Sequence, residues 1–214
     1  MKLSPQAENI LVSLSGENVK LGDVRKIARE IKKDHDLASE LWSSGQFLPR
    51  QLAILIMDKK LITEEVIDRL LDDMSQHPEK EKLQLVDWFM ANQLLKDKQF
   101  LPIIENWVDS FSPLKRRIFW YHQGRLRWTG KTPPSNSDVL LSIMEQRIES
   151  EEPEVQWAMN FTAGWIGVFE EKYRDRCIAL GENTGLYKGI KVPKNCTPDY
   201  LPEFIRIEAG KRNL

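Results

Sequence analysis

Helical periodicity is the feature of this sequence that most constrains its fold, because it runs almost unbroken along the chain. In GDVRKIAREIKKD, the apolar residues Val24, Ile27, Ala28 and Ile31 fall on one helical face, with Arg and Lys opposite. In TEEVIDRLLDDM, Thr63 stands where a helix N-cap is expected. No pair of alternating strands joined by a hairpin turn is found. The pattern predicts an all-α protein.

The spacing of the turns predicts how these helices are organised. About ten helices of ~10–15 residues, joined by short turns, favour helix pairs stacked side by side as in an α-solenoid, with a globular all-α bundle as the alternative. We expect one domain over residues 1–214, with a clear loop at TGKTPPSNSD and an irregular, Pro/Gly-rich tail from about residue 183. The segment RQLAILIMDKK is apolar almost all round, which predicts an inner helix.

Several classes of protein are excluded by what the sequence lacks. No apolar run approaches the ~20 residues that a membrane helix needs, and no signal peptide is recognisable. Two cysteines and three scattered histidines make no metal-binding spacing, so neither a metal nor a cofactor is expected. The absence of a phosphate-binding glycine loop, a nucleophile elbow and an HExxH motif argues against a conventional hydrolase or NTPase. We expect a reduced, cytoplasmic protein.

A local cluster of positive charge contrasts with the net charge of −1. Ser112-Pro113 is typical of a helix start, and cations in the first turn oppose the helix dipole unless an anion is near. Clustered guanidiniums at such a helix end suit phosphate, so we predict DNA binding here, against the simpler alternative of a solvated charged face. The predicted DNA-binding residues are Lys115, Arg116, Arg117, Arg125, Arg127 and Lys131. A strongly acidic run follows at residues 149–154.

The apolar stretch LVDWFMANQLL carries Trp88 and Asn92 one helical turn apart, on the same face. A buried Asn is acceptable only if its amide is hydrogen-bonded. The pair is therefore either part of a satisfied core or the wall of a site. From these residues alone, the core interpretation is favoured.

Several stretches together resemble the DNA alkylation repair family of HEAT-like-repeat DNA glycosylases. They are LGDVRKIAREIKKDHDLASELW, PRQLAILIMDKK, NWVDSFSPLKRRIFW and EVQWAMNFTAGWIG, which lie in order over residues 21–169. The resemblance implies HEAT-like helical repeats stacked as a curved α-solenoid, with a concave basic groove for duplex DNA. It also implies recognition of alkylated or distorted sites and excision of cationic alkylated purines.

The same resemblance implies a set of site residues. The aromatic residue that faces the lesion matches Trp88, and the second site aromatic, a Trp in the family, matches Phe161. The site arginine matches Arg117, with Arg116 a near-equal candidate. The family's aspartate falls on Asn92. The expected catalytic set is therefore Asn92, Trp88 and Phe161.

Asn92 is the important departure from the family pattern. Excision puts positive charge on the sugar, which a carboxylate stabilises, whereas an amide can orient water but carries no charge. One charge pair at ~4 Å and an effective dielectric of ~20 contributes roughly 4 kcal/mol, or roughly a thousandfold in rate. We expect impaired excision. The alternative function is a non-catalytic α-solenoid scaffold for an unidentified protein partner.

Overall fold

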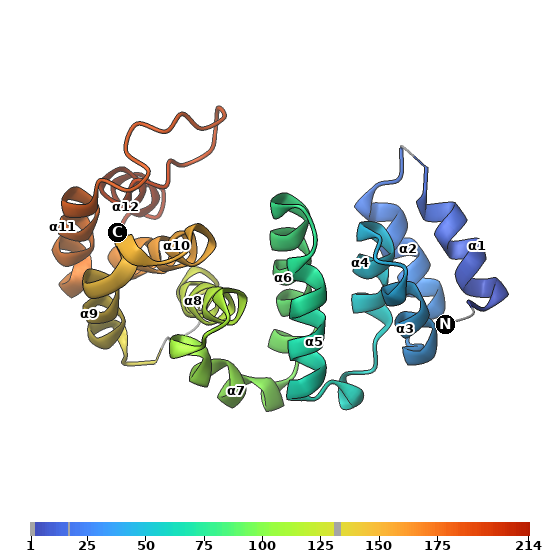
Figure 1. Ribbon diagram of the computed structural model, residues 1–214. Coiled ribbons are helices and arrows are strands. Elements are labelled where there is room, and N and C mark those ends of the chain that lie inside the picture. The colour runs from blue at the N-terminus through green and yellow to red at the C-terminus, as the bar shows by residue number, and fades with distance from the viewer. Residues whose placement is uncertain (1–2, 17, 131–133) are drawn as a thin grey trace. The chain divides into compact units, whose positions relative to one another are not determined.

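The chain is described by a computed structural model that covers residues 3–16, 18–130 and 134–214. These residues form twelve α-helices, several short 3-10 turns and no strand (Figure 1), which confirms the all-α prediction. The chain divides into two compact units, Met1–Ile103 and Ile104–Leu214. Within the described ranges, no helix is both long and apolar enough to cross a bilayer.

Helix α4 is the centre of the first unit. It packs against α2, α3 and α6, and Leu52, Ala53 and Ile54 are fully buried. This confirms the prediction of an inner helix. Thr63 caps α5 as expected, its Oγ1 accepting a hydrogen bond from the Val66 N–H at 3.3 Å. The helices of this unit are α1 (Pro5–Leu14), α2 (Leu21–Ile31), α3 (His35–Ser43), α4 (Phe47–Ile56), α5 (Glu64–Ser75) and α6 (Glu79–Asn92).

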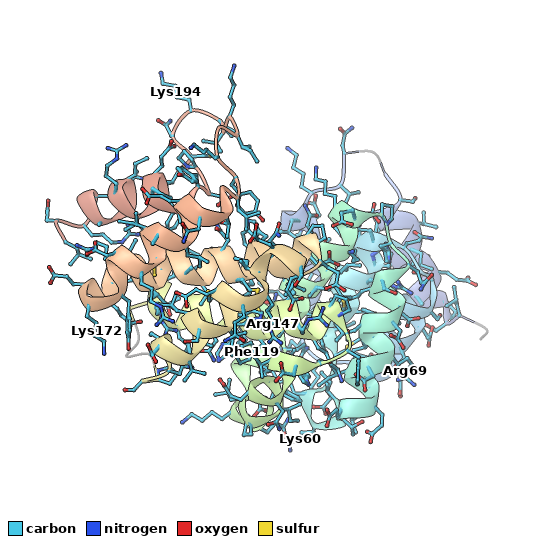
Figure 2. All side chains as sticks on the ribbon, turned by 60° about the vertical axis from the view of Figure 1, so that its left-hand side comes forward. Lys60, Arg69, Phe119, Arg147, Lys172 and Lys194 are labelled. Carbon is cyan, nitrogen blue, oxygen red and sulfur yellow. The ribbon has the colours of Figure 1, made fainter. Side chains whose placement is uncertain are left out.

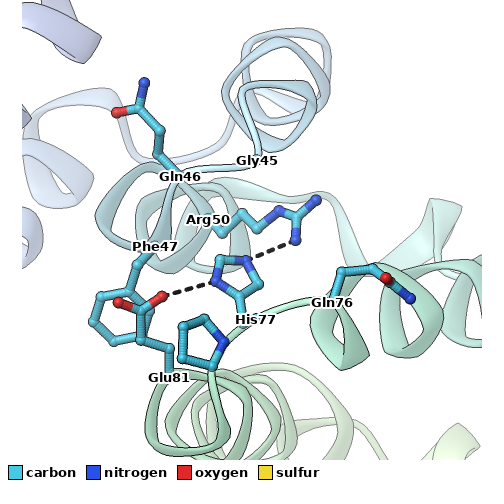
Figure 3. A pocket seen from close by; sticks show the side chains of 8 residues that line it. Gly45, Gln46, Phe47, Arg50, Gln76, His77 and Glu81 are labelled. Atoms are coloured by element: carbon cyan, nitrogen blue, oxygen red, sulfur yellow. Dashed lines mark hydrogen bonds and ion pairs between the residues drawn. The ribbon is translucent and has the colours of Figure 1, made fainter.

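A buried arginine ties α4 to its neighbours. Arg50 donates to the carbonyl oxygens of Trp42 at 3.3 Å and Asp73 at 2.7 Å, and its Nη1 lies 2.7 Å from His77 Nε2. Because arginine only donates, Nε2 accepts, and the Nδ1–H of a neutral His77 donates to Glu81 at 2.9 Å. Figure 3 shows these hydrogen-bonded side chains at the wall of a pocket. The volume of this pocket is about 490 Å³. All these hydrogen bonds join residues of the first unit, so the side chains of Arg50, His77 and Glu81 hold the fold together.

The second unit is built around α10. This helix packs against α8, α11 and α12. The short helix α7 (Leu101–Glu105) spans the boundary between the units. The other helices are α8 (Pro113–Trp128), α9 (Ser137–Arg147), α10 (Pro153–Phe169), α11 (Arg174–Thr184) and α12 (Leu201–Gly210). The basic helix begins as predicted, with Ser112 as its N-cap and Pro113 at its first position.

Two boundaries differ from the sequence-based expectation. The helix through Trp88 is expected from the sequence to end near Lys98, but α6 ends at Asn92 and Leu94–Lys96 forms a 3-10 turn. Residues 185–200 contain no helix, as expected, but α12 forms after them. It forms because Leu201, Phe204 and Ile205 bury an apolar face against α10 and α11.

We expect Gly181→Ala to destabilise the protein. A Cβ on Gly181 would lie 2.7 Å from both Leu201 Cβ and Pro202 Cδ, atoms that cannot move without shifting α12. Overpacking of this kind costs about 1–3 kcal/mol of unfolding free energy. The matched control is Gly22→Ala in α2, where a Cβ meets nothing within 4 Å, and which should stabilise by up to about 1 kcal/mol. Denaturant unfolding of both variants measures the difference, and equal stabilities would contradict the packing of α11 on α12.

Candidate nucleic-acid interface

Trp88 and Asn92 lie together at the end of α6, on one face as expected. Trp88 is half-buried, and its Nε1 donates to the Gln51 carbonyl oxygen of α4 at 3.0 Å. The guanidinium carbon of Arg25 lies 5.0 Å from the indole ring centre. Asn92 is also half-buried, and its Nδ2 donates to the Trp88 carbonyl oxygen at 2.9 Å. The amide is therefore bonded on one side only.

The basic residues of α8 divide into two groups, and the first is used inside the second unit. Arg116 pairs with Glu151 at 2.9 Å and with Glu152, both in the acidic run. Arg117 is only 4% exposed, and its Nη1 donates to the Glu154 carbonyl oxygen at 3.0 Å. These two side chains fasten α8 to the start of α10.

Arg127 belongs to the same group and is the most deeply buried of the predicted DNA-binding residues that the structure describes, with 2% of its surface exposed. It pairs with Glu170 at 2.7 Å and donates to Ser137 Oγ at 2.6 Å and Asn136 Oδ1 at 3.1 Å. It also donates to the carbonyl oxygen of Gln123 at 3.0 Å. A buried guanidinium with this many acceptors links helices, so Arg127 is not available to a ligand.

The second group lies against aromatic rings. The guanidinium carbon of Arg125 is 5.8 Å from the ring centre of Tyr121 and 5.5 Å from that of Trp128. The Lys115 ammonium is 5.3 Å from the ring centre of Trp107. Arg125 is half-buried and makes no ion pair with any described residue. Lys131, also predicted to bind DNA, lies outside the described residues.

Phe161 is the centre of a row of rings that we call the aromatic strip. Its ring centre lies 5.0 Å from Tyr121, 5.4 Å from Trp157 and 6.1 Å from Trp165. The four-residue spacing along α10 puts its aromatics on one face. The strip consists of Tyr121 and Trp128 from α8 and of Trp157, Phe161, Trp165 and Phe169 from α10.

The aromatic strip is too exposed to be core alone. Trp128 is 44% exposed and Phe169 39% exposed. Gly124 allows this packing, because a Cβ there would lie 2.5 Å from Phe161 Cδ1. Of these rings, only Phe161 was predicted from the sequence as a site residue. The four-residue spacing of the other α10 aromatics is visible in the sequence. An aromatic stripe on one helical face is more often buried, however, and only the structure shows that part of this one is exposed.

Glu208 holds Arg212 at the far end of the strip. The Arg212 guanidinium carbon lies 4.8 Å from the Trp165 ring centre, and its Nη1 pairs with Glu208 Oε2 at 2.5 Å. Burial alone would raise the pKa of Glu208, but hydrogen bonds from Lys211, Thr197 and Arg212 outweigh it and lower the pKa to about 2.

The chain matches a protein-family model over most of its length. The family model described as DNA alkylation repair enzyme matches residues 17–162. The chain belongs to the DNA alkylation repair enzyme family. Comparison with curated proteins found no match.

A solved structure supports the fold of this DNA alkylation repair enzyme family member. It is described as a new family of proteins related to the HEAT-like repeat DNA glycosylases with affinity for branched DNA structures. It has 19% sequence identity and a TM-score of 0.66, and the match covers 98% of this chain and 88% of that one. The all-α, HEAT-like fold class predicted from the sequence is therefore confirmed.

Acid should destabilise the second unit partly through Glu208. Its pKa is lower in the folded protein than its ordinary value of 4.5, so its contribution to stability is present above that value and is lost as the pH falls towards about 2. Thermal unfolding of the wild-type chain from pH 6 to pH 2, with Glu208→Gln as comparison, measures this. The wild-type melting temperature should fall more steeply, and parallel curves would contradict the assignment.

Proposed function

We propose that the chain binds DNA through the aromatic strip and Arg125, and that its excision of alkylated bases is weak. The observation that carries the proposal is Arg125, a cation without an ion-pair partner among the described residues, held between Tyr121 and the exposed Trp128. A guanidinium beside exposed rings suits a nucleic acid, since the charge attracts phosphate and the rings contact bases or sugars. Membership of the DNA alkylation repair enzyme family supports the same ligand.

Within this proposal, the predicted residues have different roles. Phe161 lies at the centre of the contact surface, and Lys115 and Lys131 remain predicted contacts to phosphate. Arg116, Arg117 and Arg127 position α8 and α10, because their guanidiniums are bonded within the unit. Duplex DNA with alkylated or distorted sites is the proposed substrate class. An affinity for branched DNA, described for the structural relative, is compatible with a strip that accepts unstacked bases.

Trp88 and Asn92 are the proposed excision residues. Trp88 offers an aromatic face, and the Oδ1 of Asn92 accepts no hydrogen bond from any described residue, so it can orient water. A neutral amide does not stabilise the positive charge that develops on the sugar. Excision therefore depends on the cationic base being a good leaving group, and it should be slow.

The second candidate function is a protein-interaction scaffold without activity on DNA. One observation favours it: Arg116 and Arg127, two of the six predicted DNA-binding residues, form ion pairs inside the unit. Exposed Trp and Arg side chains also occur at the energetic centres of protein interfaces. The salt dependence of DNA binding separates the two functions.

Arg125→Ala should weaken DNA binding about tenfold and reduce the salt slope by about one phosphate contact. Fluorescence anisotropy with duplex and branched DNA at several salt concentrations measures both quantities. Arg206→Ala is the matched control, because Arg206 is exposed on α12 and outside the strip. Affinity that does not change with salt, or equal losses in both variants, would favour the scaffold.

Asn92→Asp should increase the rate of excision by up to roughly a thousandfold. The assay is single-turnover cleavage of DNA carrying a cationic methylated purine, with Asn106→Asp, an exposed position in the second unit, as control. An increase in Asn92→Asp alone supports an excision site at Trp88 and Asn92. Absence of product in every version would sink the enzymatic part of the proposal.

A further inference from the structure

Three helices of the first unit end around one hollow. Helix α2 ends at Ile31, α4 at Ile56 and α6 at Asn92, and the residues that follow each of them line a cavity of about 440 Å³. We call it the lysine hollow, because five of its lining residues are Lys32, Lys33, Lys59, Lys60 and Lys96. Lys60 lies at the molecular surface (Figure 2). The hollow belongs to the first unit, whereas the aromatic strip belongs to the second.

The lysine hollow is positively charged. Asp58 and Asp97 also line it, but Asp58 pairs with Lys33 at 3.1 Å and accepts the Lys60 backbone N–H at 3.1 Å. No carboxylate of a described residue forms an ion pair with the other four lysines. Each helix C-terminus adds roughly half a negative charge, which three lysine charges in excess of the aspartates outweigh.

Lysines near helix C-termini are common, because they interact favourably with the dipole. That explanation accounts for each lysine singly. It does not explain Lys32, which occupies the C-cap of α2 with φ of 69°, a left-handed conformation that favours glycine. It also does not explain the unpaired amide oxygen of Gln93.

Gln93 lines the hollow and has an unsatisfied hydrogen-bond acceptor. Its side chain is 2% exposed, and its Nε2 donates to the carbonyl oxygens of Ile54 and Met57. Those bonds fix the amide orientation, and its Oε1 has no hydrogen-bond partner among the described residues. Buried amide oxygens are normally paired. Asn92, the adjacent residue, lines the same hollow with its own Oδ1 unbonded.

We propose that the lysine hollow binds a nucleotide unit: a phosphate group held by the lysines, with its sugar or base donating N–H or O–H to Gln93 and Asn92. Lysine ammoniums suit phosphate as compact point charges. A cation alone would be repelled, and a phosphate alone would leave the Gln93 oxygen unpaired. The volume is within the range of small-ligand sites. The nucleotide comes either free or as the end of a nucleic-acid strand.

Calorimetric titrations of the full chain at low salt test the site with four probes: adenosine monophosphate, inorganic phosphate, single-stranded DNA with a 5′-phosphate, and the same DNA with a 5′-hydroxyl. Binding of adenosine monophosphate more tightly than inorganic phosphate indicates a free nucleotide. A stronger response to 5′-phosphorylated than to 5′-hydroxyl DNA indicates a strand end. Either result supports the proposal.

The variants decide whether this binding occurs in the lysine hollow. The pair Lys59→Gln and Lys60→Gln should weaken the binding of the responding probe at least about tenfold. The matched control pair, Lys26→Gln and Lys80→Gln, removes the same charge from exposed positions outside the hollow and should change it less than about twofold. Asn92→Asp, which adds a negative charge, should also weaken it.

The proposal would be overturned if no probe bound, or if the hollow and control pairs lost binding equally. Its failure is separable from that of the proposed function. Arg125→Ala should leave adenosine monophosphate binding unchanged, because Arg125 lies in the second unit. Conversely, Asn92→Asp has opposite expected effects on excision and on nucleotide binding, so the two readouts report on different claims.

Discussion

The buried charge of Arg127 is the constraint on which the second unit depends. Removing a guanidinium from water is expensive unless its donors are matched, and here they reach Glu170, Ser137, Asn136 and a backbone carbonyl. The side-chain partners lie at the end of α10 and at the start of α9. One side chain thereby fixes α8 against both helices. The aromatic strip lies along α8 and α10, so its geometry depends on this linkage.

The cationic side chains of this protein fall into a structural group and a group available to ligands, and the two groups differ in burial. Arg50 and Arg127 are buried, hydrogen-bonded inside their own units and structural. Arg125 and the lysines of the hollow are more exposed and, apart from Lys33, make no ion pair with any described residue. A near-neutral net charge therefore does not exclude an anionic ligand. The acidic residues neutralise some of the cationic side chains and leave parts of the surface positive.

The sequence allowed prediction of features that are local. Helical periodicity and capping residues predicted α5 and α8 with their N-caps, Thr63 and Ser112. Such signals come from contacts within one or two turns, which a sequence window contains. The pairing of Trp88 with Asn92 on one face was also predictable for this reason.

Long-range pairing was not predictable. Arg116 meets Glu151, and Arg127 meets Glu170, only when α8 packs on α10, so the charge cluster in the sequence does not show which residues remain available. The lysine hollow gathers residues from three loops, and no single segment predicts it. Exposure of Trp128 likewise follows from the packing of two helices.

Side-chain oxidation footprinting of the free and DNA-bound protein tests the central claim most directly, because it reports which rings DNA covers. Trp128 and Phe169, both exposed in the free protein, should become protected at saturating DNA, whereas the exposed Ile190 in the loop before α12 should keep its reactivity. Unchanged oxidation of Trp128 and Phe169 with DNA fully bound would contradict the aromatic strip as the DNA-binding surface.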